Sequence, residues 1–142
     1  SDFIDVKVVN TNNEALGIYA FDEQIKMQIK FSVAEDYINK AVIGFRVKDQ
    51  HERVIFSSEK NIKELTNTEG VKIITISIPK AMLVPNEYSV FLGYHIPNQE
   101  LISLIEDAVT FKIEETGSNM HIYHGNDYGC VVLDCEWVND NI

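Results

Sequence analysis

A strict alternation of apolar and polar residues between residues 24 and 33 is the feature that most constrains the fold. The apolar positions are Ile25, Met27, Ile29, Phe31 and Val33. Because successive side chains of a β-strand point to opposite faces, a period of two predicts a strand with one face in a core and the other in solvent. Such half-buried strands are typical of antiparallel sheets.

Similar segments recur along the chain and are separated by residues that favour turns. Further strands are predicted at residues 41–49, from Val54 onward, and at residues 71–78, 87–95 and 107–114. Residues 101–105 fit either a strand or a short helix, and the polar residues 60–70 allow one helical turn at most. Residues 129–138 predict a last strand that ends on Trp137. About eight short strands without a long helical period predict an all-β fold, an antiparallel β-sandwich of the jelly-roll or immunoglobulin-like type.

Length and composition predict one soluble domain. A chain of 142 residues fits a single domain over residues 1–142, and its content of 45% hydrophobic and 24% charged residues is that of a globular protein. No apolar run reaches the length of about 18 residues that a membrane span needs. Residues 1–3 do not resemble the start of a signal peptide.

Charge and cysteine content narrow the partners and the compartment. With 12 basic and 22 acidic residues the net charge is −10, which repels nucleic acid and the anionic surface of a membrane. Neither is therefore an expected partner. Cys130 and Cys135 are five residues apart, so in a strand their side chains point to opposite faces and do not pair. Reduced thiols favour the cytoplasm.

The sequence predicts no catalytic residue, no metal and no cofactor. Glycine-rich phosphate loops and a nucleophile elbow are absent from the sequence. His121 and His124, with Asp127 nearby, are the best metal candidates, but their spacing places the two imidazoles on opposite faces of a strand. Glu106 and Asp107 are adjacent, so their carboxylates cannot flank one glycosidic bond. Asp107 is interpreted as an acid that anchors a turn or loop.

Two predicted strands carry residues suited to binding. If Phe45 and its neighbours at every second position face the core, Arg46 and Lys48 stand together on the outer face, where they suit an anionic group or are simply solvated. In residues 87–95, Phe91 and His95 share a face with small residues. An aromatic ring beside polar groups is a suitable platform for a sugar, although Phe91 in the core is an equal alternative. We therefore predict Arg46, Lys48, Phe91 and His95 as carbohydrate-binding residues.

The order of these segments resembles a known family. Five segments carry the resemblance. They are residues 21–24, which lead into the first alternating strand, residues 42–49, residues 86–95, residues 105–113, and residues 129–133, which precede Trp137. In this order they resemble the C-terminal domain of Wzt, the nucleotide-binding subunit of ABC transporters that export O-antigen polysaccharide. The resemblance extends from Ile18 to Trp137. One departure is Ser103-Leu104, where families of this kind place an aromatic residue.

The resemblance implies a function and a location. It implies a carbohydrate-binding domain that recognises the modified non-reducing end of an O-antigen polysaccharide and so licenses export. It also implies an ATPase domain preceding Ser1, a homodimer formed in some members by exchange of the C-terminal strand, and partnership with the ATPase and membrane subunits. The expected location is the cytoplasm, at the inner face of the bacterial inner membrane.

Two alternatives remain at this point. The apolar residues 131–133 and Trp137 are also consistent with a dimerisation or protein interaction module that has no glycan ligand. An enzyme of the cupin-like or glycosidase-like kind is the other alternative. Because the sequence contains no matching catalytic spacing, we expect a binding module and not an enzyme.

Overall fold

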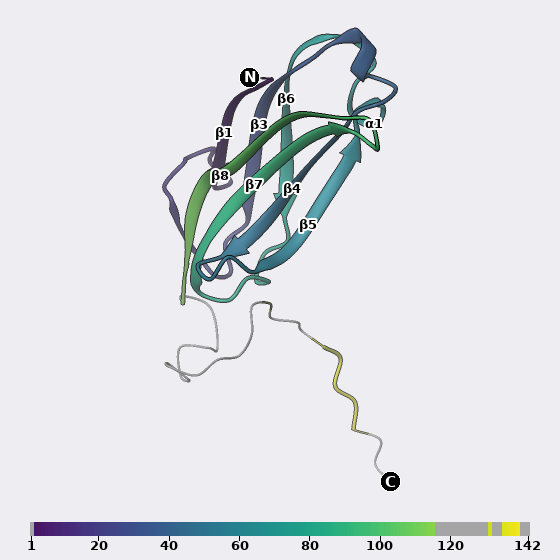
Figure 1. The fold of residues 1–142 in the computed structure, drawn as a ribbon. Coiled ribbons are helices and arrows are strands. Elements are labelled where there is room, and N and C mark those ends of the chain that lie inside the picture. The colour runs from purple at the N-terminus through teal and green to yellow at the C-terminus, as the bar shows by residue number, and fades with distance from the viewer. Residues whose placement is uncertain (1, 116–130, 132–134, 140–142) are drawn as a thin grey trace.

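The computed structural model describes residues 2–115, 131 and 135–139 of the chain. Within these residues, eight strands form two sheets that pack face to face (Figure 1). The three-stranded sheet has the order β1 (Phe3–Val9), β3 (Ile25–Val33), β6 (Gly70–Ile78). The five-stranded sheet has the order β2 (Ile18–Ala20), β8 (Glu100–Glu114), β7 (Asn86–Ile96), β4 (Val42–Asp49), β5 (Val54–Asn61). The predicted all-β sandwich is therefore confirmed.

The core lies between the two sheets and follows from the alternation within each strand. In β3 every odd-numbered residue from Ile25 to Val33 is buried, whereas Lys30 on the other face is exposed. β4 and β7 repeat this pattern, with Val47 and Leu92 fully buried. The inner faces of the two sheets thus bury their apolar side chains against each other, and the outer faces meet solvent.

Most of the predicted strands are present in the structure. The segments predicted at residues 24–33, 41–49, 71–78 and 87–95 correspond to β3, β4, β6 and β7, and Val54 begins β5. The helical turn is α1 (Ile62–Leu65), and a short 3-10 helix, η1 (Glu35–Tyr37), precedes β4. The ambiguous residues 101–105 are extended, because they form one long strand, β8, together with residues 107–114.

Two strands were not predicted from the sequence, and each has a physical reason. In β1 the register against β3 shifts between Phe3 and Asp5, and Val8 and Val9 are both buried, so no period of two survives. β2 has only three residues, too few to display a period. It pairs in parallel with β8, an exception to the otherwise antiparallel pairing.

The predicted last strand does not extend to Trp137. Residues 135–139 have no regular secondary structure, and the Trp137 side chain is 92% exposed. Apolar sequence alone cannot indicate whether a sheet partner is available, and residues 135–139 are not part of a strand. Val131 forms an isolated antiparallel bridge with Leu83. The rest of the predicted strand, together with His121, His124, Asp127 and Cys130, lies outside the described residues.

Candidate functional site

The four residues predicted to bind carbohydrate lie on one surface, the outer face of the five-stranded sheet. Arg46 and Lys48 come from β4, and Phe91 and His95 come from the neighbouring strand β7 (Figure 1). In the β4–β7 register, Arg46 is opposite Phe91 and Lys48 is opposite Ser89. Because both strands alternate in phase, side chains more than 40 residues apart in sequence become neighbours on this face.

Two cations of β4 lie close to the Phe91 ring on this face. This half-buried ring has the Arg46 guanidinium carbon 5.6 Å and the Lys48 ammonium nitrogen 5.2 Å from its centroid. Both distances are within the range of cation–π attraction. The alternative in which Phe91 belongs to the core is therefore wrong, because Leu92, the next residue, takes the buried position.

The two cations differ in their partners. The Lys48 ammonium forms an ion pair with the Glu52 carboxylate at 3.3 Å. Arg46 is exposed, and it forms no ion pair with any residue that the structure describes. The Arg46 guanidinium therefore keeps its hydrogen-bond donors available to solvent or to a ligand.

A pair of glycines forms a groove beside Phe91. Gly44 of β4 is directly opposite Gly93 of β7, so two adjacent positions on this face lack side chains. We call the resulting depression, of about 570 Å³, the glycine groove. Its lining comprises Gly44, Phe45, Arg46, Ser57, Ser58, Glu59, Phe91, Gly93, His95, Leu101 and Leu104. Three of the four predicted residues thus border one depression, and Lys48 stands just outside it.

The two glycines are present for different physical reasons. A Cβ atom on Gly44 would lie 3.0 Å from Glu59 Cβ and 3.2 Å from the Ser58 carbonyl oxygen, so the close approach of β5 requires a glycine. A Cβ atom on Gly93 would have its closest neighbour, Leu104 Cδ1, at 4.0 Å. Packing leaves room at Gly93, and the effect of that glycine is to keep the groove open.

The walls of the glycine groove differ in polarity. On the β8 side, the large apolar side chains of Leu101 and Leu104 are 60% and 45% exposed. On the β5 side, Ser57 and Glu59 carry polar groups. An apolar wall opposite a polar wall matches a sugar ring, which has apolar C–H faces and hydroxyl groups around its edge.

Sequence analysis missed most of these wall residues. Leu104 and Ser57 carry no recognisable motif, and only the pairing of β8 and β5 with their neighbours brings them to the groove. Gly44 did leave a signal, since a glycine inside a strand often marks a place where another group approaches closely. The sequence alone could not indicate that Gly44 and Gly93 are paired.

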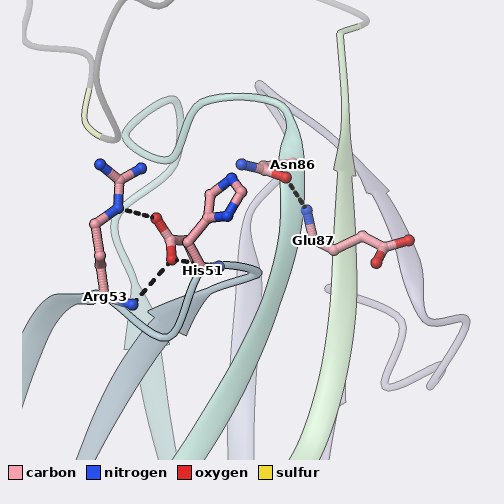
Figure 2. Close-up of polar contacts among 5 residues, drawn as sticks. His51, Arg53, Asn86 and Glu87 are labelled. Atoms are coloured by element: carbon pink, nitrogen blue, oxygen red, sulfur yellow. Dashed lines mark hydrogen bonds and ion pairs between the residues drawn. The ribbon is translucent and has the colours of Figure 1, made fainter.

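A second depression lies on the same face, near the turn between β4 and β5. We call this depression, of about 640 Å³, the hairpin groove. Its lining comprises Gly17, Ile18, Asp49, Gln50, Glu52, Glu87, Tyr88, Ser89, Asp107, Thr110, Phe111 and Lys112. Figure 2 shows this end of the sheet, with His51 and Arg53 in the turn after β4 and Asn86 and Glu87 at the start of β7.

Asp49 stabilises the turn and is not available to a ligand. Its buried carboxylate accepts hydrogen bonds from the backbone N–H groups of His51 at 2.8 Å and Arg53 at 3.0 Å, and from Arg53 Nε at 2.8 Å (Figure 2). Burial by itself raises the pKa of Asp49, but the hydrogen bonds and the charge of Arg53 outweigh it and hold this pKa below its usual value.

Asp107 lies inside a strand and not in a turn between strands. In the β7–β8 register, only Phe91 separates Val90 from Leu92, whereas their partners Val109 and Ile105 are separated by residues 106–108. The extra residues form a bulge in which Asp107 has a φ of 49°. The interpretation of Asp107 as a turn-anchoring acid is thus corrected.

Among the described residues, no group of three potential metal ligands occurs.

The fold and this face define a β-sandwich domain with an open, grooved sheet surface. No helix in the described part of the chain is long and apolar enough to cross a membrane. The model of the Wzt C-terminal domain family matches residues 2–131 of this chain. The chain therefore belongs to the Wzt C-terminal domain family, as its sequence resemblance predicts.

A solved structure agrees with this assignment at the level of the fold. The crystal structure of the C-terminal domain of Wzt matches with a TM-score of 0.67 and 11% sequence identity, covering 96% of this chain and 82% of that one. A β-glucuronidase of Parabacteroides merdae matches with a TM-score of 0.42 and 18% identity over 78% of this chain and 13% of the enzyme, too weakly to support an inference. A comparison with curated proteins found no relative.

Proposed function

We propose that this chain binds the modified non-reducing terminus of an O-antigen polysaccharide in the glycine groove. Membership of the Wzt C-terminal domain family supports a role in polysaccharide export. The observation that carries the proposal is the Gly44–Gly93 pair, which opens a groove bordered by Phe91, Arg46 and His95. Binding then licenses export by the ABC transporter, and the chain performs no catalysis.

The groove has suitable groups for each part of a sugar. Phe91 and Leu104 offer apolar surface to the C–H face of a pyranose ring, and Arg46 and His95 offer hydrogen-bond donors to its oxygen atoms. Lys48 adds a second cation on Phe91. A shallow, open groove buries little apolar surface, so we expect weak binding.

The remaining parts of the proposal concern assembly. The ATPase and membrane subunits of the transporter are the proposed partners, and the proposed location is cytoplasmic, at the inner face of the bacterial inner membrane. An ATPase domain preceding Ser1 is part of this proposal. These statements are supported by family membership.

A homodimer, formed by exchange of the C-terminal strand, is also proposed. The exposed Trp137 and Val138 are consistent with an interface in this region. They also favour the second candidate function, a dimerisation module without a glycan ligand. Deletion of residues 128–142, followed by light scattering, tests the interface. We expect the mass to fall from dimer to monomer, and an unchanged mass would argue against an interface there.

Titration with polysaccharide tests the proposed ligand. The probes are the capped and the uncapped O-antigen polysaccharides of the strain that encodes this chain, followed by ¹⁵N NMR spectra. We expect the capped form to shift the resonances of Gly44, Phe91 and Gly93. Gly93→Val should abolish the shifts of Gly44 and Phe91 by filling the groove, whereas Ser77→Val, on the outer face of β6, should not. An equal response to both polysaccharides, or none, would contradict the proposal.

A further inference from the structure

We propose that the hairpin groove is a second glycan subsite, which binds interior sugars of the same polysaccharide chain whose terminus occupies the glycine groove. These interior sugars are of a neutral, hydroxyl-rich class. The inference rests on the proposed function and extends it, because it concerns sugars that carry no terminal modification.

The two grooves adjoin along one strand. On the outer face of β7, Ser89 lines the hairpin groove and Phe91, the next residue on that face, lines the glycine groove. From Gly93 to Ser89 the strand advances by about 13 Å, at roughly 3.3 Å per residue. This distance accommodates consecutive sugars of one chain. A glycan that starts over Gly93 and runs along β7 therefore enters the hairpin groove.

The boundary between the grooves supports passage of a chain. Phe91 lies at this boundary and is opposite no residue of β8 in the strand register, because the bulge at residues 106–108 interrupts the pairing of β7 and β8. Its ring, with Arg46 and Lys48 beside it, offers a stacking surface between the two depressions. The same bulge places Asp107 in the hairpin groove.

The side chains of the hairpin groove determine the class of sugar. Ser89 and Thr110 are opposite each other on β7 and β8 and carry hydroxyl groups. Glu87 and Asp107 are exposed carboxylates. Carboxylates accept hydrogen bonds from sugar hydroxyls but repel acidic sugars. With Lys112 as the cation of this lining and Glu52 paired with Lys48, the groove favours neutral sugars.

The dependence of affinity on glycan length tests the inference. The O-antigen polysaccharide of the encoding strain is partly hydrolysed and separated into fragments that keep the capped non-reducing end and differ in length. Calorimetry or NMR then gives the Kd of each fragment. We expect the affinity to rise with length until a fragment spans both grooves and then to remain constant. An affinity that is the same for all lengths would overturn the inference and leave the proposed function intact.

Paired variants locate the additional contact. Ser89→Ala with Thr110→Ala should weaken binding of long fragments by about tenfold, through loss of two hydrogen bonds, and leave the shortest fragment unaffected. Ser77→Ala with Thr75→Ala makes the same chemical change on the three-stranded sheet and should leave both affinities unchanged. An equal loss for short and long fragments would overturn the second subsite. Failure of every fragment to bind the parent protein would overturn the proposed function as well.

Discussion

The outer faces of the two sheets are built from the same alternating pattern and yet differ in shape. On the three-stranded sheet, β3 and β6 pair without a register shift from Ile25–Ile78 to Val33–Gly70, and side chains such as Lys30 and Thr75 project at regular intervals. On the five-stranded sheet, Gly44 is paired with Gly93, and β8 bulges beside Phe91. The grooves arise because side chains are missing at the two glycines and because the pairing of β7 and β8 is interrupted. They do not arise from a difference in polarity between the two faces.

The largest expected effect concerns the glycine that packing requires. Gly44→Ala should destabilise the protein by about 1–2 kcal/mol, because the new Cβ atom meets Glu59 Cβ at 3.0 Å and the Ser58 carbonyl oxygen at 3.2 Å. Urea denaturation measures this change. Gly93→Ala is the matched control and should not destabilise, since its Cβ atom has a neighbour only at 4.0 Å. An equal loss of stability in both variants would contradict the prediction that packing requires a glycine at position 44 and not at position 93.

A comparison of apolar residues on the two faces addresses binding. Phe91→Ala should weaken binding of the capped polysaccharide by about tenfold, since the stacking surface is lost. Ile73→Ala is the control on the outer face of β6, where Ile73 is 67% exposed. It should leave the Kd unchanged. If both variants lost affinity to the same degree, binding would depend on exposed apolar surface in general and not on the grooved face.

A smaller effect, limited to acidic solution, is expected at the turn that borders the hairpin groove. The pKa of Asp49 is held below its usual value of 3.8, so the folded state favours its charged form. This contribution to stability is present above the unfolded pKa and is lost as pH falls through the folded pKa. Asp49→Asn should therefore flatten the decline of stability below about pH 4, as thermal unfolding measured against pH reveals. If the stability of the parent protein and that of Asp49→Asn declined in parallel below about pH 4, this prediction would be wrong.

The smallest expected effect concerns the ion pair beside Phe91. Glu52→Gln should change the free energy of unfolding by less than about 1 kcal/mol, because Glu52 is 70% exposed and water screens its attraction to Lys48. Urea denaturation at low and at high salt measures it. A larger, salt-dependent loss of stability would mean that the Lys48–Glu52 ion pair stabilises the turn between β4 and β5.

Sequence reasoning succeeded where a local period carries the information. The inner residues of β3, β4 and β7 follow from a period of two, and the same period places Arg46 and Lys48 on one side of β4 and Phe91 and His95 on one side of β7. It failed for β1, in which a register shift breaks the period, and for the strand predicted to end on Trp137. In both places the deciding factor is the partner strand, which local sequence does not specify.

The sandwich class, the family resemblance and the grouping of candidate side chains on one face of each strand can be read from the sequence, which left open whether Phe91 faces the core. The fold determines that Phe91 is on the outer face, that Arg46 is opposite Phe91, that Gly44 is opposite Gly93, and that the β8 bulge lies beside them. The physical reason is that side-chain direction is a local property of a strand, whereas a groove depends on register between strands far apart in sequence. That register is set by packing of the whole core.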